Sequence, residues 1–207
     1  LRGDMSKLKK VYSFDGQGFN ENFLKKYNKE ITDNGYKIYN ICNEYDYVNI
    51  IMRSVSNKIF IKSTTNIGNE DTRYSKIVHI LGGVHSPYSM FKKENGILTL
   101  NEVVEQSEIM KNFEKLFEYY DANMDEEDNK FMYYRMSLLM MDSGKEVFGV
   151  ECPISPKGFF KRFTKLTREF TKNESDLDAS EITRLFKPIF SDIGSIIIKG
   201  KISENNR

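Results

Sequence analysis

The sequence has no tryptophan and only two cysteines, two histidines and four prolines among its 207 residues. Cys42 and Cys152 lie far apart, and neither belongs to a C-x-x-C motif. This pattern predicts free buried thiols in a reducing compartment, the cytoplasm, and argues against a disulfide framework. With so few histidines and cysteines the chain also carries no transition-metal motif, so we expect neither a metal nor another cofactor.

Long apolar runs and an excess of charge are missing too. No run approaches the roughly 20 apolar residues that a bilayer-spanning helix needs, so no transmembrane segment is expected. The first residues show no signal-peptide pattern. The formal net charge is +1, which provides no overall basic field for nucleic acid, and we expect no nucleic-acid partner.

The first half of the chain alternates between strand-like and helix-like patterns. A helical stripe with a spacing of four residues begins at Phe19, and Tyr47–Val55 has the spacing of a short helix. The expected strands are Val11–Phe14, Tyr36–Cys42 and Lys58–Thr64. The order β-α-β-α-β predicts parallel strands joined by right-handed crossovers, and therefore the α/β class.

From about residue 100 the pattern becomes helical. We expect helices over Asn101–Tyr120 and Lys130–Ser143, separated by an acidic link, and a third helix opened by Ser155-Pro156. Asp178 has the spacing of a helix cap, and Pro188 should kink or split the helix that follows. The sequence thus predicts a sheet region over residues 1–100 and a helical layer or cap over residues 101–207.

The stretch Asp15-Gly16-Gln17-Gly18 joins a predicted strand to a predicted helix. Such a turn could present backbone N–H groups to an anion. It lacks the third glycine of a dinucleotide fingerprint and the lysine of a phosphate loop, so a structural turn is the favoured interpretation. Asp15 and Gly16 remain candidates for the lining of a substrate cleft, because they follow the carboxyl end of a strand.

Asp46 and His85 are the candidate catalytic residues. Asp46 follows the second predicted strand, although an aspartate there is also a good cap for the helix expected after it. His85 lies in a Gly-Gly loop, and the pKa of an imidazole near neutrality suits proton transfer. His79 sits within an apolar run and is more typical of a packed core histidine.

The segment Lys157–Lys172 is both basic and amphipathic. Its phenylalanines fall on one side of a helix and its Lys and Arg residues surround them. It could contact an anionic membrane or a partner protein. A helix that packs its Phe stripe on the sheet is the favoured alternative.

Three segments taken together, "KVYSFDGQGFNENF", "NEYDYVNII" and "GGVHSPYSMF", resemble the Mbeg-like family, a lipase-like group with the α/β-hydrolase fold. The resemblance covers about residues 9–95. It implies a chain order of Ser, then Asp, then His, with Asp46 as the acid and His85 as the base of a catalytic triad. It also implies a small acyl-ester or lipid substrate.

The chain departs from that family at one point, because G-x-S-x-G occurs nowhere in it. In the family this serine precedes the strand that corresponds to Val11–Phe14. We therefore expect the chain to be the C-terminal part of an α/β-hydrolase, carrying the acid and the base but not the nucleophile, and inactive by itself. The alternative is a hydrolase-like remnant without catalytic activity, which serves as a protein- or membrane-interaction module.

Overall fold

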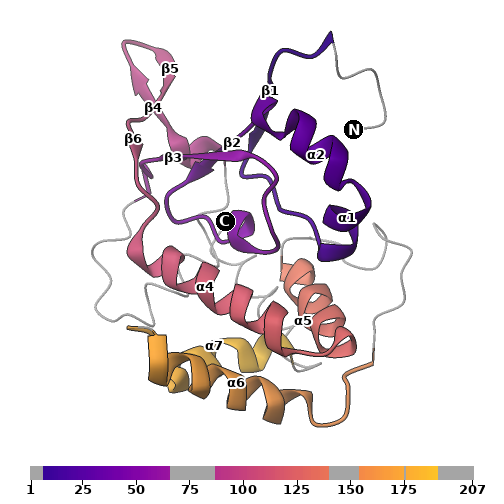
Figure 1. The fold of residues 1–207 in the computed structure, drawn as a ribbon. Helices are drawn as coiled ribbons and strands as arrows, with labels where there is room; N and C mark the ends of the chain where they lie inside the picture. The colour runs from indigo at the N-terminus through magenta and orange to yellow at the C-terminus, as the bar shows by residue number, and fades with distance from the viewer. Residues whose placement is uncertain (1–6, 66–86, 140–153, 175, 191–207) are drawn as a thin grey trace. The chain divides into compact units, whose positions relative to one another are not determined.

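The computed structural model describes residues 7–65, 87–139, 154–174 and 176–190 (Figure 1). These residues form a mixed α/β protein with a mostly parallel sheet and helices. The chain divides into two compact units, Leu1–Phe117 and Glu118–Arg207. The division falls within helix α4 (Glu108–Asn123).

The first unit is built on a four-stranded sheet. Its strands are β1 (Val11–Phe14), β2 (Ile38–Asn43), β3 (Asn57–Ile61) and β6 (Val103–Val104), in the spatial order β1-β2-β3-β6. The first three strands run parallel, and β6 pairs antiparallel to β3. The parallel arrangement of the first three strands, which the sequence predicted, is confirmed.

Two short helices and a 3-10 turn connect β1 to β2, namely α1 (Glu21–Lys26), α2 (Asn28–Asn34) and η2 (Gly35–Lys37). Asn20 caps α1, because its Oδ1 accepts the N–H of Phe23 at 2.8 Å. The stripe beginning at Phe19 predicted one continuous helix. The backbone instead breaks at Tyr27, with φ −111° and ψ 22°.

The helix predicted over Tyr47–Val55 is wrong. Only one 3-10 turn, η3 (Val48–Ile50), forms there. Met52 adopts a left-handed φ of 67°. The N–H and C=O of Arg53 bond the C=O and N–H of Phe19 at 3.2 and 2.9 Å. This tertiary pairing draws the chain out of helical conformation, which local spacing does not reveal.

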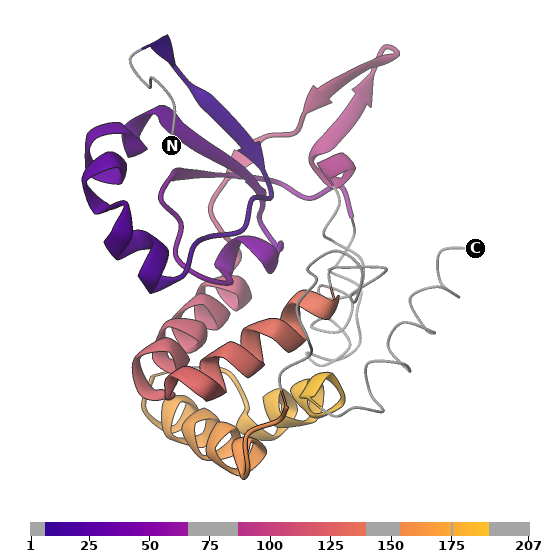
Figure 2. The same ribbon diagram turned by 90° about the vertical axis from the view of Figure 1, so that its right-hand side faces the viewer.

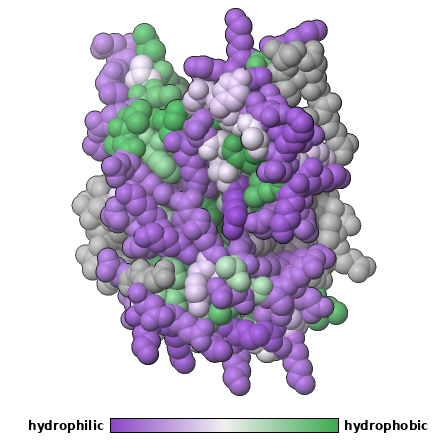
Figure 3. All heavy atoms as spheres, viewed as in Figure 1, coloured by the Kyte–Doolittle hydropathy of each residue, from purple (hydrophilic) through white to green (hydrophobic). Residues whose placement is uncertain are grey.

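A hairpin that the sequence analysis missed follows the 3-10 turn η4 (Pro87–Met90). Its strands are β4 (Phe91–Glu94) and β5 (Ile97–Leu100), joined at Asn95-Gly96 with φ values of 51° and 83°. Asn-Gly is the preferred sequence of such a turn. The hairpin projects from the four-stranded sheet (Figure 2) and exposes Ile97 and Leu98, and hydrophobic residues gather over it in Figure 3.

The helix predicted from Asn101 begins later, at Glu108. The residues before it are taken up by β6, because Val103 and Val104 pair with Ile61 and Phe60 of β3. At its other end α4 extends into the predicted acidic link as far as Asn123. An available strand edge thus overrides the local helical pattern.

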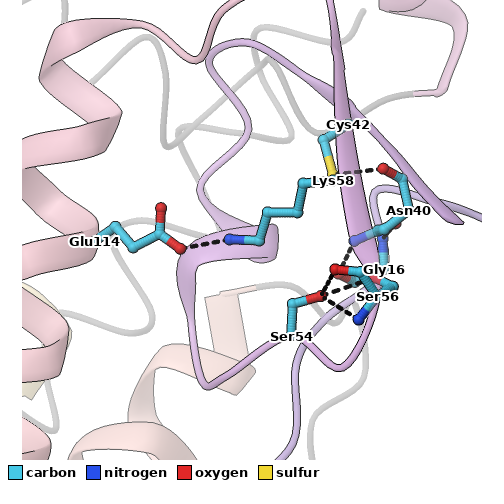
Figure 4. Close-up of polar contacts among 7 residues, drawn as sticks. All are labelled: Gly16, Asn40, Cys42, Ser54, Ser56, Lys58 and Glu114. Carbon is cyan, nitrogen blue, oxygen red and sulfur yellow. Dashed lines mark hydrogen bonds and ion pairs between the residues drawn. The ribbon is translucent and has the colours of Figure 1, made fainter. Parts of the chain in front are cut away.

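The two faces of the four-stranded sheet are packed differently. On one face Ile41, Ile61 and Met90 form a buried cluster, with Ile59 and Phe91 packed against it. On the other face the Lys58 side chain makes an ion pair with Glu114 of α4 at 2.5 Å (Figure 4). Both side chains of that pair are partly buried, so it ties β3 to the first turns of α4 within the first unit.

The second unit contains helices α5 (Glu126–Leu139), α6 (Phe159–Glu174) and α7 (Ala179–Phe190). Phe163 of α6 is fully buried, and its ring centroid lies 5.0 Å from that of Phe190 and 5.8 Å from that of Phe186. Phe159 also contacts Phe131 of α5, at 4.8 Å. The Phe stripe of α6 therefore packs on helices α5 and α7, and not on the sheet as the sequence suggested.

Helix α7 begins as its sequence predicts. The Oδ1 of Asp178 accepts the N–H groups of Ser180 and Glu181 at 2.7 and 2.9 Å. Pro188 was expected to kink or split this helix, yet the helix runs through it to Phe190. The proline does not split the helix, although it lacks the N–H that would bond the carbonyl four residues earlier.

Candidate functional site

The polar residues of the first unit gather where the parallel strands end. Asp15 follows β1, Asn43 ends β2, and Ser63 comes shortly after β3. Because the three strands are parallel, these residues share one edge of the sheet. The carboxyl edge of a parallel sheet is where α/β proteins place their ligands, so we take it as the candidate site.

Asp15 joins the ends of the first two strands. Its N–H donates to Ile41 O at 2.9 Å, and its Oδ1 accepts the N–H of Asn43 at 2.8 Å. The residue is buried and has a φ of 46°, a left-handed value that aspartate tolerates better than most residues. The turn thus directs the Asp15 carboxylate over the end of β2.

The backbone of Gly16 is held by a neighbouring strand. Its N–H donates to Asn40 Oδ1 at 3.0 Å, and its C=O accepts from Asn40 Nδ2 at 2.8 Å (Figure 4). The first of these bonds uses the Gly16 N–H, one of the donors that could have bound an anion. The helix α1 that follows has only six residues. The favoured interpretation of this stretch as a structural turn therefore agrees with the geometry.

Gly18 is needed because the chain passes very close to another segment. A Cβ at this position would lie 2.6 Å from the carbonyl carbon and oxygen of Arg53, which are backbone atoms that cannot move aside cheaply. The close approach belongs to the backbone pairing of Phe19 with Arg53. The two glycines in this stretch thus serve packing between β1, β2 and the chain beyond β2.

Asp46 lies beyond the carboxyl end of β2 and is almost completely buried. Its Oδ1 accepts the N–H of Val48 at 3.0 Å, and its own N–H donates to Asn43 O at 3.0 Å. It thus caps a single 3-10 turn, where the sequence predicted the start of a longer helix.

Negative charge at this edge acts on its buried neighbours. Burial raises the pKa of the Cys42 thiol far above its usual value, and the charges of Asp15 and Asp46 raise it further. Burial likewise raises the pKa of Tyr47, with the Asp46 charge as the second cause. Both groups are therefore neutral at physiological pH, and Cys42 is a packed thiol, not a nucleophile.

Asn43 is the most connected polar residue that sequence reasoning missed. Its side chain is fully buried, and its Nδ2 donates to both Ser63 Oγ and Ser89 Oγ. Its Oδ1 accepts the N–H of Tyr45 at 2.9 Å. The only sequence signal for it was its position as a polar residue at the end of an apolar strand.

Three of the residues considered in the sequence analysis, His79, His85 and Cys152, lie outside the described residues. The structure therefore brings Asp15, Gly16 and Asp46 to the same end of the sheet and does not describe the predicted base. Within residues 7–65, 87–139, 154–174 and 176–190, no cluster of three or more His, Cys, Asp or Glu side chains could hold a metal ion.

Helix α6 shows which part of the basic segment Lys157–Lys172 faces solvent. Phe159, Phe163 and Phe170 are buried within the second unit. Four of its exposed positions are basic and recur at helical spacing: Lys161, Lys165, Arg168 and Lys172. Glu169 makes an ion pair with Lys165 at 3.6 Å. The helix thus presents charge to solvent, while its apolar face is occupied by its own neighbours.

None of the helices in the described part of the chain has the length and apolar character required to cross a bilayer. Comparison with known proteins gives no further constraint, since no family model, curated protein or solved structure matches the sequence or the fold. The candidate site therefore has to be interpreted from its own geometry.

Proposed function

We propose that the protein forms the C-terminal part of a serine hydrolase of the lipase or esterase type, with the α/β-hydrolase fold of the Mbeg-like family. In this proposal Asp46 is the acid and His85 the base of a Ser-Asp-His triad. A serine on a segment outside these 207 residues supplies the nucleophile. The substrate is a small acyl ester, thioester or lipid.

One observation carries the proposal, namely the position of Asp46 at the carboxyl edge of three consecutive parallel strands. Asp46 follows the second of these strands and is buried there. His85 follows the third strand in the chain. This is the order in which α/β-hydrolases arrange their acid and base after the nucleophile strand.

The edge of β1 supports the same interpretation. The N–H of Asp15 donates to Ile41 O of β2. Because successive residues of a strand direct their backbone groups to opposite sides, the N–H and C=O groups of Tyr12 and Phe14 point away from β2. Among the described residues β1 has no neighbour on that side. The Tyr12 and Phe14 side chains are 55% and 43% exposed. An edge strand presents N–H and C=O groups that can pair with another strand, so this edge suits a further strand that brings the nucleophile.

The proposed chemistry follows from these roles. His85 takes the proton of the serine hydroxyl as its oxygen attacks the acyl carbon, and Asp46 holds the imidazole and stabilises its positive form. His85 then gives the proton to the departing alcohol or thiol, which leaves an acyl-enzyme. Water, activated by the same imidazole, releases the acid and restores the serine.

The decisive experiment uses the polypeptide as its gene encodes it, including any residues that precede Leu1. A fluorophosphonate probe should label a serine in a G-x-S-x-G motif upstream of β1. Asp46→Asn should lower kcat by about 10⁴, because the imidazole loses its orientation, while the control variant Asp33→Asn, at an exposed position of α2, keeps the activity. Absence of the motif, or a separation of more than about 8 Å between the Asp46 carboxylate and the His85 imidazole, would refute the triad.

A second candidate function is a non-catalytic interaction module that contacts an anionic membrane through α6. The exposed row of four basic residues favours it, at about 1 kcal/mol of attraction per cation near an anionic surface. Because the Phe stripe is buried, this contact would be electrostatic and peripheral. A cytoplasmic location would suit either function, and the free buried thiol of Cys42 is compatible with a reducing compartment.

The two candidates differ in a vesicle-binding experiment. Replacing the four basic residues of α6 with glutamate should abolish binding to vesicles that contain phosphatidylserine; the residues replaced are Lys161, Lys165, Arg168 and Lys172. A control with the same change in net charge replaces four exposed lysines elsewhere, Lys9, Lys26, Lys93 and Lys130, and should retain binding. If the unaltered protein does not bind these vesicles, or if the two variants lose binding equally, the membrane role of α6 is refuted.

A further inference from the structure

Asn43 connects two parts of the chain that are far apart in sequence. Its Nδ2 donates to Ser63 Oγ at 3.1 Å and to Ser89 Oγ at 2.6 Å. A primary amide has two N–H donors, so both are used here. Ser63 lies just beyond β3 and Ser89 just before β4, and His85 is in the stretch of sequence between them.

Further bonds hold the same two points together. The N–H and the Oγ1 of Thr64 both donate to Ser89 O, at 2.7 and 2.9 Å. The Oε1 of Glu44 accepts the N–H of Ser63 at 3.0 Å. The chain leaving β3 and the chain entering β4 are therefore fastened to each other and to the end of β2.

The remaining groups of Asn43 bind the turn that carries Asp46. Its C=O accepts the N–H of Asp46, its Oδ1 accepts the N–H of Tyr45, and its own N–H donates to Asp15 Oδ1. Asn43, which is 0% exposed, thus uses all three of its N–H donors and both of its carbonyl oxygens at one point. Such a fully satisfied buried network fixes a single arrangement, because each lost bond leaves a costly unpaired group.

We propose that Asn43 is a positioning residue, a clamp that holds the base of the His85-bearing segment beside the Asp46 turn. Its consequence for catalysis rests on the proposed function, whereas the clamp itself follows from the hydrogen bonds. Bringing the two ends of a long segment together costs conformational entropy, and hydrogen bonds between those ends offset this cost. Through Asn43, β2 thus holds the backbone at Ser63 and at Ser89 in place.

Asn40 provides a matched control for testing the clamp. It lies on the same strand, is almost as deeply buried, and also makes two side-chain hydrogen bonds, but to Gly16. Amide hydrogen exchange should be roughly tenfold faster at Ser63, Thr64 and Thr65 in Asn43→Ala, since about one net hydrogen bond is lost at the clamp. In Asn40→Ala the same amides should exchange as in the unaltered protein. Equal exchange in the two variants would overturn the clamp.

Two gentler substitutions serve if Asn43→Ala fails to fold. Ser63→Ala and Ser89→Ala each remove one acceptor of the Asn43 amide and leave the strand itself intact. Each should accelerate exchange at Thr64 by a few-fold, and the double variant by more. Ser54→Ala, which removes a serine bonded only to nearby Ser56, is the control. No acceleration in the double variant would also refute the clamp.

A histidine titration separates the clamp from the proposed function. In a His79→Ala background the imidazole signals belong to His85 alone. Asp46→Asn should lower the pKa of His85 by about one unit, because a neighbouring carboxylate favours the imidazolium. Asn43→Ala should lower it in the same direction with Asp46 intact. If Asp46→Asn leaves the pKa of His85 unchanged while Asn43→Ala still accelerates amide exchange at Thr64, the triad fails and the clamp stands.

Discussion

The two units of the chain have different interiors. In the first unit buried polar side chains stand among the apolar ones, including Asp15, Asn40, Asn43 and Asp46. In the second unit the interior is mainly rings, with Phe159, Phe163, Phe186 and Phe190 in mutual contact. Buried polar groups cost free energy unless they are hydrogen-bonded, whereas a ring gains free energy from burial itself and does not need a hydrogen-bond partner. The interior of the first unit therefore depends on matched hydrogen bonds, whereas that of the second unit depends mainly on the burial of rings.

The largest effect should come from removing a ring of the second unit. Phe163 has no exposed surface and contacts the rings of Tyr120, Phe159, Phe186 and Phe190. Phe163→Ala should reduce the free energy of unfolding by about 4 kcal/mol, through lost burial and the cavity that remains. Phe160→Ala, at a half-exposed position of the same helix, should cost far less. Denaturant unfolding measures both, and similar losses would argue against a ring-packed core.

In the first unit a comparable loss should follow from a single added methyl group. Gly18→Ala places a Cβ against the Arg53 backbone, where neither chain can yield easily. We expect a loss of about 2–3 kcal/mol, typical of overpacking. The adjacent residue Gln17 is exposed, so Gln17→Ala should change stability by less than about 0.5 kcal/mol. A tolerated alanine at position 18 would show that the approach of the two segments is looser than described.

The polar interior of the first unit should also be detectable as a dependence on pH. Burial, with the Asp15 and Asp46 charges, raises the pKa of Cys42 in the folded protein. A neutral Cys42 thiol is compatible with the folded state, so the full stability is present below about pH 8.5, the ordinary pKa of a thiol. Stability is then lost as the pH rises from there towards the pKa of Cys42 in the folded protein. The slope should reach about 1.4 kcal/mol per pH unit from this one group.

Cys42→Ala is the control for this pH dependence. Unfolding midpoints measured from pH 7 to pH 10 should fall less steeply in this variant than in the unaltered protein. Identical slopes would mean that the Cys42 thiol is not buried beside the two carboxylates, and the difference between the two interiors would then be smaller than we infer.

The smallest effect concerns a local feature that sequence and structure agree on. Asp178→Ala should lower stability by about 1 kcal/mol, because two N–H groups at the start of α7 lose their acceptor. Asp178→Ser keeps a capping oxygen and should recover most of the loss. Thermal or denaturant unfolding can resolve the difference. Equal stability of the two variants would show that α7 depends on packing alone.

Sequence reasoning succeeded where the relevant physics is local. The strands around Val11–Phe14 and Lys58–Thr64, and the cap at Asp178, were predicted from composition and spacing to within a few residues. The Asn95-Gly96 turn carried an equally local signal that was overlooked. By contrast, the stretch Tyr47–Val55 has helical spacing but forms only one turn, because Arg53 pairs with Phe19 from another part of the chain.

The candidate site shows the same limit. Asp15 and Asp46 could be proposed from their positions after strands, since parallel strands bring their carboxyl ends together. Asn43 could not, because its importance depends on Ser63 and Ser89, which approach it only in the folded chain. A hydrogen-bonded network joining three segments has no fixed spacing in sequence.

The amino-acid sequence by itself determined the α/β class, the parallel sense of the first three strands and the start of the last helix, because these depend on side-chain periodicity and on groups a few residues apart. Only the tertiary structure decided that the glycines of Asp15-Gly16-Gln17-Gly18 serve packing, that the Phe stripe of α6 lies among helices, and that Asn43 binds both ends of the segment containing His85. Those outcomes depend on which segments far apart in sequence come into contact, and no short stretch of the sequence determines the energy of such contacts.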